Sequence, residues 1–238
     1  MKDAPSQRAV LISGANGGIG TAVALELMSD EYRLSLGARS AHTDPTIQAA
    51  IESKRVHSSI FDAQTEGHAE DWVDSALSRY GRIDAVVNCI GIYTNYTFTD
   101  RSFDELDKAI DVNVKAPIRI IRAVYPHLVV AENPKIINVV SLSGFRVLGK
   151  SAGYPMSKFA LRALGHSVRW SGWEHKIRVT NLCPGWVNTK MAEGRSKLAP
   201  EEMTQPQDIA KIVRLLLELP PTCSIADLAV NCILDPYF

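Results

Sequence analysis

The sequence has no long hydrophobic run, no excess of charge of one sign and no closely paired cysteines. No apolar stretch approaches the roughly 20 residues that span a bilayer, and the segment that follows Met1 lacks the apolar core of a secretion signal. Lys and Arg together number 26, as do Asp and Glu, so net charge gives no general attraction to nucleic acid or to an anionic membrane. We therefore expect a cytoplasmic protein that binds neither nucleic acid nor membranes.

The cysteines argue against two further kinds of site. Cys89, Cys183, Cys223 and Cys232 lie far apart, without the close pairs typical of a zinc site or a redox dithiol. A chain of 238 residues is also long enough to bury a core without disulfides. We expect four reduced cysteines that pack in the interior, and no metal site.

Short runs rich in β-branched residues alternate with longer stretches of helical period along the chain. This alternation predicts parallel strands joined by helical crossovers. No repeat or linker divides residues 1–238, so we expect an α/β protein with one domain, a doubly wound parallel sheet of about seven strands. The predicted strands are 8–12, 33–36, 55–61, 83–88, 135–140, 177–182 and 228–231, and the predicted helices are 18–28, 46–52, 66–80, 103–130, 154–175 and 207–219.

The stretch SGANGGIG at 13–20 places four glycines between the first predicted strand and the first predicted helix. Such a turn points the free N–H groups and the positive dipole end of the helix at the sheet edge, where a phosphate can bind. Gly14 suits the tight turn, Gly18 the close approach of backbone to a pyrophosphate, and Gly20 the packing of the helix on the sheet. Taken alone, a glycine-rich turn also fits a purely structural role.

Tyr154 and Lys158 are four residues apart in a predicted helix, so both side chains lie on one helical face. A partly desolvated ammonium beside a phenol stabilises the phenolate, which predicts a lowered pKa for Tyr154. Ser141 follows the predicted strand 135–140 and therefore lies at the carboxyl edge of the sheet, where ligands bind in such folds. Without this serine the Tyr–Lys spacing also fits an ordinary surface pair.

Taken together, these segments resemble the short-chain dehydrogenase/reductase family over nearly the whole chain. The shared pattern includes the glycine turn, N-x-x-G at 88–91, the Asn of DVNVKAP at 111–117, Y-x-x-x-K at 154–158 and P-G at 184–185. The resemblance implies a Rossmann-like fold. It also implies an NAD(P)-dependent oxidoreductase that interconverts a carbonyl compound (a ketone, aldehyde or quinone) and an alcohol by hydride transfer, with NADPH-dependent reduction preferred.

The resemblance implies four catalytic residues. Tyr154 would be the general acid in carbonyl reduction, and Ser141 would hold the carbonyl oxygen. Lys158 would acidify Tyr154, helped by the positive charge of an oxidised nicotinamide, and would bind the nicotinamide ribose. Asn113 would hold a water that links Lys158 to solvent.

Cofactor choice depends on the end of the second predicted strand. NAD-dependent dehydrogenases usually have an acidic residue about 20 positions beyond the glycines, whereas this chain has Ala38. The guanidinium of Arg39 suits a 2′-phosphate in charge and geometry, and Ser40 can add a hydrogen bond. We therefore expect NADP (NADPH) as the cofactor, with NAD as the alternative.

The resemblance also implies the remaining cofactor contacts. The segment 88–91 would lie beside the adenosine, where Ile90 in place of the usual alanine crowds the site. Asp62 would accept from the adenine amino group, or is a solvated loop residue, and the segment 183–189 would face the nicotinamide carboxamide. The predicted cofactor-binding residues are Gly14, Asn16, Gly18, Ile19, Gly20, Arg39, Ser40, Asp62, Asn88, Gly91, Tyr154, Lys158, Pro184, Gly185, Val187 and Thr189.

The substrate is predicted only as a small carbonyl or alcohol molecule. The expected pocket lining is mostly apolar or aromatic, and we see no cluster of basic residues that would demand a charged substrate. Ser143 is also the competing candidate for the catalytic serine, but the family's serine stands three residues before a glycine, and Gly144 selects Ser141. The predicted substrate-binding residues are Tyr93, Ser143, Phe145, Leu148 and Trp186.

Two other classes of protein share parts of this pattern. A non-catalytic NADP-binding sensor or scaffold of the same fold would typically lack Tyr154 or Lys158, and both are present. A serine hydrolase would need a G-x-S-x-G elbow and a histidine placed as its base, and no motif supplies either. The resemblance also implies a homo-oligomer, a dimer or tetramer, built on the helices at 116–130 and 154–175. Candidates for an apolar contact stripe there are Ile118, Ile121, Ala160 and Leu164.

Overall fold

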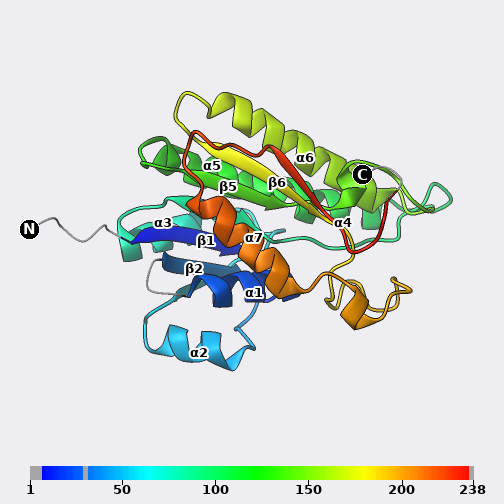
Figure 1. The fold of residues 1–238 in the computed structure, drawn as a ribbon, viewed down its shortest axis with the longest axis horizontal. Helices are drawn as coiled ribbons and strands as arrows, with labels where there is room; N and C mark the ends of the chain where they lie inside the picture. The colour runs from blue at the N-terminus through cyan, green and yellow to red at the C-terminus, as the bar shows by residue number, and fades with distance from the viewer. Residues whose placement is uncertain (1–6, 29–31, 236–238) are drawn as a thin grey trace, which may run out of the picture.

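The computed structural model describes residues 7–28 and 32–235, and its centre is a sheet of seven parallel strands (Figure 1). The strand order β3-β2-β1-β4-β5-β6-β7 confirms the expected doubly wound α/β class. The order reverses between β1 and β4, and in such sheets ligands bind outside the carboxyl ends of the strands at this point. The strands are β1 Arg8–Ser13, β2 Tyr32–Ala38, β3 His57–Ile60, β4 Ala85–Asn88, β5 Lys135–Val139, β6 Arg178–Pro184 and β7 Asp227–Val230.

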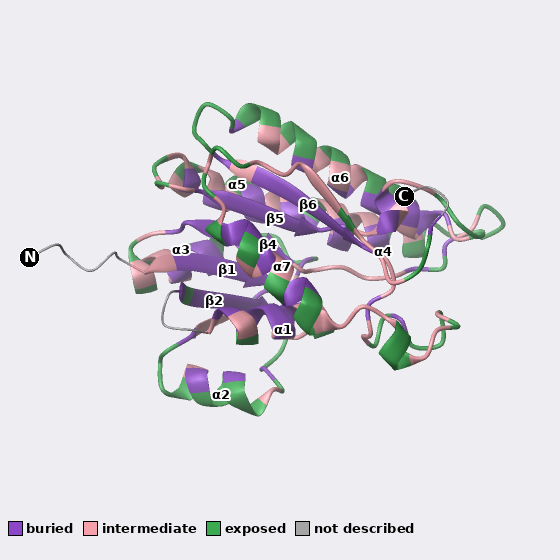
Figure 2. Cartoon of the chain, viewed as in Figure 1, coloured by how far each residue is buried: buried purple, intermediate pink, exposed green. Residues whose placement is uncertain are grey.

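Helices cover both faces of the sheet because successive strand residues point to opposite sides. Val10 and Ile12 of β1 pack with residues of α1 and α7, whereas Leu11 between them packs with residues of α3 and α5. Figure 2 shows the result: the five inner strands are mostly buried, and the outer faces of the helices are exposed. None of the described helices is long and apolar enough to cross a membrane. The helices are α1 Gly18–Leu27, α2 Pro45–Glu52, α3 His68–Tyr80, α4 Asp104–Ile110, α5 Ala116–Val129, α6 Gly153–Ser171 and α7 Pro206–Glu218.

The helix predicted at 103–130 is not one regular helix. A π-helical segment, Asp111–Lys115, separates α4 from α5, and Asn113 lies at its centre. Single π turns inside helices occur frequently at functional sites. The prediction was wrong here because the helical period of the sequence continues across the segment, whereas the wider turn is coupled to the long-range hydrogen bonds of Asn113 described below.

A row of polar side chains crosses five neighbouring strands at paired positions. Ser13 donates to Asn88 at 3.3 Å, and Asn88 donates to Asn138 at 2.9 Å. Asn138 donates to Asn181 at 3.3 Å, and Asn181 donates to Asp227 at 3.0 Å. Each member except Asp227 is at most 1% exposed, and each amide is satisfied by its neighbour, as buried polar groups must be. The row fixes the relative positions of the strand ends that carry the site.

Candidate active site

The glycine turn between β1 and α1 is too tight for side chains at two of its positions. Gly14 has a φ of +65°, which favours glycine, and a Cβ there would lie 2.8 Å from the backbone of Ile90. A Cβ on Gly20 would overlap the carbonyl oxygen of Gly14. α1 begins after Gly17 with no side-chain cap and no acidic residue in its first turn, so its N–H groups are available to an anion. The turn fits the diphosphate of a dinucleotide.

Gly18 brings the loop after β6 against this turn. A Cβ on Gly18 would lie 2.6 Å from the Thr189 methyl carbon. Thr189 in turn donates to the carbonyl oxygen of Val187 at 3.3 Å. The structure thus places two of the predicted cofactor-binding segments, far apart in sequence, in direct contact.

The end of β2 meets the glycine turn through Asn16. Its Nδ2 donates to the carbonyl oxygens of Ser40 and Ala41, both at 2.9 Å. Arg39 and Ser40 are exposed, directly after the buried Ala38. The Arg39 guanidinium is therefore accessible to a ligand phosphate at this edge, while the Asn16 amide positions the loop.

The side chains of three residues expected at the adenosine site make contacts within the protein. Asn88 is fully buried in the polar row, so its side chain does not face a ligand, contrary to the expectation of a direct contact. Asp62 accepts from the backbone N–H of Gln64 at 3.0 Å, the bond of a turn residue. Ile90 packs against the core cluster of α3 and α5, which removes the reason for expecting it to crowd the adenosine.

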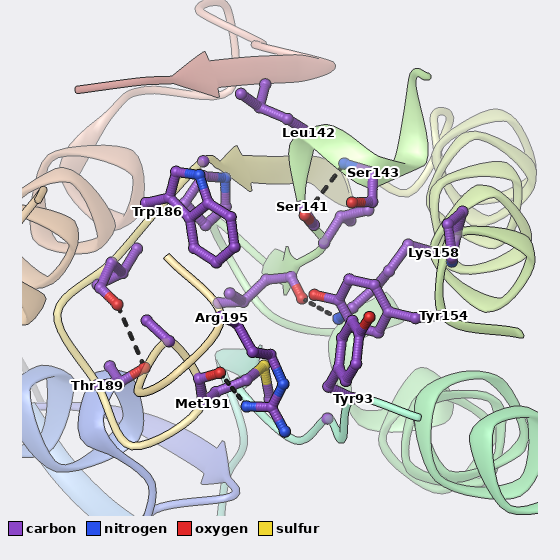
Figure 3. Close-up of a pocket in the computed structure, with 18 of the residues that line it drawn as sticks. Tyr93, Ser141, Leu142, Ser143, Tyr154, Lys158, Trp186, Thr189, Met191 and Arg195 are labelled. Carbon is purple, nitrogen blue, oxygen red and sulfur yellow. Dashed lines mark hydrogen bonds between the residues drawn. The ribbon is translucent and has the colours of Figure 1, made fainter. Parts of the chain in front are cut away.

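The end of β5 and the start of α6 bring Ser141, Tyr154 and Lys158 to one cavity (Figure 3). The Lys158 side chain is nearly fully buried. Its Nζ lies 5.7 Å from the centroid of the Tyr154 ring and donates to the carbonyl oxygen of Val139 at 3.1 Å. The hydroxyl of Ser141 accepts from the backbone N–H of Ser143 at 3.0 Å. This arrangement places a phenol, a hydroxyl and a buried ammonium around one space.

Burial governs the proton affinities in this cluster. Burial raises the pKa of Tyr154, while a hydrogen bond with Ser141 and the charge of Arg195 act against that rise. Burial also lowers the pKa of Lys158 to about 8. The protein's own groups therefore do not lower the Tyr154 pKa, because desolvation of the phenolate outweighs them and the Lys158 ammonium is directed at a backbone carbonyl. The lowering expected beside an oxidised nicotinamide stays a prediction.

Asn113 joins the loop after β4 to α6. Its Oδ1 accepts from the backbone N–H of Ile92 at 2.8 Å, and its Nδ2 donates to the carbonyl oxygen of Ile92 and to Ser157 Oγ, each at 2.9 Å. A Cβ on Gly91 would lie 3.3 Å from Lys158 Nζ and 3.5 Å from Asn113 Oδ1. Asn113 therefore lies next to the ammonium, where its role in holding a water stays a prediction.

The cavity has a volume of about 420 Å³ and gathers most of the expected substrate-binding residues. Tyr93, Ser143, Leu148 and Trp186 line it. Phe145 is not among the lining residues; its ring packs 3.9 Å from the guanidinium carbon of Arg162, so its expected substrate contact is not found. The predicted cofactor-binding residues that line the same cavity are Ile19, Gly91, Tyr154, Lys158, Pro184, Gly185, Val187 and Thr189.

Several lining residues were not predicted one by one, and two of them are charged; Arg195 falls in the segment 190–198, which the resemblance places at the pocket. Arg146 and Arg195 both line the cavity, as do Asn231 and Ile233 from the chain after β7. Arg195 lies in a loop and Arg146 just beyond a short helical turn, where no periodic pattern indicates the direction of a side chain. The sequence shows no cluster of basic residues, whereas the fold brings two arginines that are distant in sequence to the same cavity.

The geometry agrees with comparisons to known proteins. A model of the short chain dehydrogenase family matches residues 8–199. An agropine synthesis reductase of Rhizobium rhizogenes is 35% identical over 226 residues, which cover 94% of this chain and 52% of that protein. The chain thus spans about half the length of this relative. An uncharacterized oxidoreductase of Staphylococcus saprophyticus is 26% identical over 94% of this chain and 97% of its own length.

Solved structures show the same architecture. The alcohol dehydrogenase of the archaeon Thermococcus sibiricus, complexed with 5-hydroxy-NADP, superposes with a TM-score of 0.82 at 29% identity, over 94% of this chain and 96% of that one. A short-chain dehydrogenase/reductase of Serratia marcescens has a TM-score of 0.81 at 23% identity, over 96% and 98% of the two chains, and supports the fold alone. Because the family model spans β1 to β6, the glycine turn and the Ser–Tyr–Lys cluster described above, this chain belongs to the short-chain dehydrogenase family of NAD(P)-dependent oxidoreductases.

Proposed function

We propose that this enzyme reduces a carbonyl group of a small molecule to an alcohol, with NADPH as the hydride donor. The observation that carries the proposal is the convergence of Ser141, Tyr154 and Lys158 on one cavity that is also lined by Ile19 of the glycine turn. Bound NADPH supplies the hydride, and the protein must hold and protonate the oxygen that becomes negative.

The protein's groups have complementary roles in this proposal. Ser141 donates a hydrogen bond to the carbonyl oxygen, and Tyr154 donates the proton. A raised pKa keeps the Tyr154 phenol protonated at neutral pH, which is the form that a general acid requires. Lys158, whose Nζ lies beside Gly91 as does Asn113 Oδ1, binds the nicotinamide ribose. It also transfers a proton to Tyr154 to replace the one that Tyr154 donates. The free N–H groups of the glycine turn hold the diphosphate.

The preference for NADPH rests on the end of β2. Arg39 is exposed after a buried Ala38, so the edge offers a guanidinium and no carboxylate at the position where NAD-dependent enzymes bind the ribose hydroxyls. A guanidinium recognises a phosphate through paired hydrogen bonds. The solved Thermococcus sibiricus enzyme is a complex with 5-hydroxy-NADP, which supports this assignment. The Rhizobium rhizogenes relative is named a reductase, which supports the proposed direction of the reaction.

Two assays test the proposal. Loss of NADPH absorbance is followed with a panel of ketones, aldehydes and quinones, and the dissociation constants of NADPH and NADH are measured by titration. Turnover of at least one carbonyl compound and tighter binding of NADPH are expected. Binding of a dinucleotide without any turnover across the panel would instead support a sensor of the same fold, and tighter binding of NADH would reverse the cofactor assignment.

The same proposal includes a homo-oligomeric enzyme in the cytoplasm. The exposed apolar side chains Met156, Phe159 and Trp170 of α6 support the assembly, because exposed apolar patches often mark contact surfaces. The cytoplasmic location stays a prediction from the sequence.

A further inference from the structure

Among the described residues, one of the two guanidinium groups in the active-site cavity has no acidic partner. The lining includes Arg146, Lys158 and Arg195, and no Asp or Glu. Arg146 is paired with Asp235, and Lys158 is directed at a backbone carbonyl. Across residues 7–28 and 32–235, no carboxylate lies within ion-pairing distance of Arg195. Within the described part of the chain, the positive charge of the exposed Arg195 is therefore not balanced by a carboxylate.

The fold holds this guanidinium next to the reacting groups. Its central carbon lies 4.5 Å from the centroid of the Tyr93 ring, and the Tyr93 ring centroid lies 5.1 Å from that of Tyr154. Arg195 also donates to the carbonyl oxygen of Met191. Figure 3 shows these side chains side by side, with the guanidinium between Met191 and the Tyr93 ring.

The backbone around Arg195 is also ordered by specific contacts. The backbone N–H of Arg195 donates to the carbonyl oxygen of Ala192 at 3.0 Å, and that of Ala192 donates to Thr189 at 2.8 Å. Gly194 adopts the left-handed conformation with a φ of +69°, which favours glycine. Arg195 is thus carried on a turn that is anchored at Thr189, next to the glycine turn.

We propose that Arg195 binds a carboxylate of the substrate, so that the enzyme prefers oxo acids over neutral ketones and aldehydes. A guanidinium binds a carboxylate through two parallel hydrogen bonds and retains its charge at all working pH values. Since the Tyr93 ring contacts both the Arg195 guanidinium and the Tyr154 ring, the carboxylate and the carbonyl of the substrate are several bonds apart. The inference rests on the proposed reductase activity, and it makes Arg195 a specificity residue of the same site.

The test compares acids with their neutral esters. Levulinate, its next two longer homologues and the methyl ester of each are assayed with NADPH on the native enzyme, on Arg195→Met and on the control Lys197→Met. Lys197 is an exposed cation two residues away that does not line the cavity. With the native enzyme, kcat/KM for at least one of these acids should be about 10-fold or more above kcat/KM for its ester. Arg195→Met should lower kcat/KM for that acid by about 10- to 100-fold and change the ester by less than about 3-fold.

Other outcomes separate this inference from the proposed function. Equal use of acid and ester by the native enzyme overturns the carboxylate site and leaves the reductase intact. Equal losses on acid and ester in Arg195→Met, together with weaker NADPH binding, assign the guanidinium to the cofactor instead. If no carbonyl compound is reduced, calorimetry with pentanoate decides: binding that depends on Arg195 retains the anion site without the reductase, and no binding overturns it.

Discussion

The two halves of the sheet carry different chemistry at the same carboxyl edge. Beside β1 and β2 the edge consists of the glycine turn, whose backbone N–H groups are free, and of the exposed Arg39. Beside β5 and β6 it consists of enclosed side chains, with Lys158 only 3% exposed. Backbone groups and exposed charge suit recognition of a phosphate, which stays anionic at working pH. Proton transfer needs burial, because burial shifts the pKa of the groups that exchange protons.

The largest effect is expected when the phenol oxygen of Tyr154 is removed from the edge beside β5 and β6. Tyr154→Phe should lower the turnover of any carbonyl substrate by at least about 100-fold, as expected for loss of a general acid. NADPH binding and stability should be nearly unchanged, because the remaining ring still packs against Tyr93. Tyr93→Phe, which removes a phenol oxygen from the same cavity, is the matched control and should retain most of the activity. A Tyr154→Phe enzyme with more than about a tenth of the native rate would reject Tyr154 as the acid.

Arg39→Ala tests the exposed half. It should weaken NADPH binding by about 1.5–3 kcal/mol, the usual value of hydrogen bonds to a charged group, and leave NADH binding nearly unchanged. Titration of both cofactors against the variant measures this directly. Arg55→Ala, another exposed arginine, is the control and should change neither affinity. Equal losses for NADPH and NADH would contradict recognition of the 2′-phosphate by Arg39.

Lys158 should leave a signature in the pH dependence of stability. Its pKa falls from 10.5 to about 8 in the folded protein, so between these two values the unfolded chain binds more protons than the folded one. The free energy of unfolding therefore rises with pH across this window, and burial of the charged ammonium costs stability below it. Relative to Lys158→Met, the native protein should gain about 1–3 kcal/mol between pH 8 and pH 10.

Urea unfolding of both proteins at several pH values measures this difference. Lys135 also has a pKa that burial lowers to about 8, but it is present in both proteins and its contribution cancels. Parallel pH profiles of the unfolding free energy for the two proteins would show that folding does not lower the pKa of Lys158.

The smallest expected effect on catalysis concerns assembly. Ile121 of the expected contact stripe is only 4% exposed and packs in the core, whereas Phe159 on α6 is 39% exposed. Sedimentation at micromolar concentration should show a dimer or tetramer, and Phe159→Asp should shift it toward smaller species. Leu25→Asp on α1, with a similar exposure of 38%, is the control. A monomeric native protein would contradict this prediction.

Local patterns were sufficient to predict most of the fold. The strand expected at 8–12 is Arg8–Ser13, and the helix expected at 18–28 is Gly18–Leu27, because β-branched runs and helical periods act over neighbouring residues. The break at Asp111–Lys115 was not predictable in this way. The hydrogen bonds of Asn113 there reach Ile92 and Ser157, which are 21 and 44 residues away.

For the site, local patterns in the chain are enough to identify the available chemical groups: a glycine turn before a helix, an arginine after the second strand, and Ser141, Tyr154 and Lys158 in the order of the family. The environment of these groups follows from the packing of distant segments. Burial raises the pKa of Tyr154, and the side chain of Asn88 turns into the polar row. Arg195 lines the cavity, and no carboxylate of the described residues pairs with it. Burial and ion pairing depend on segments that are distant in the chain, so no local pattern contains them.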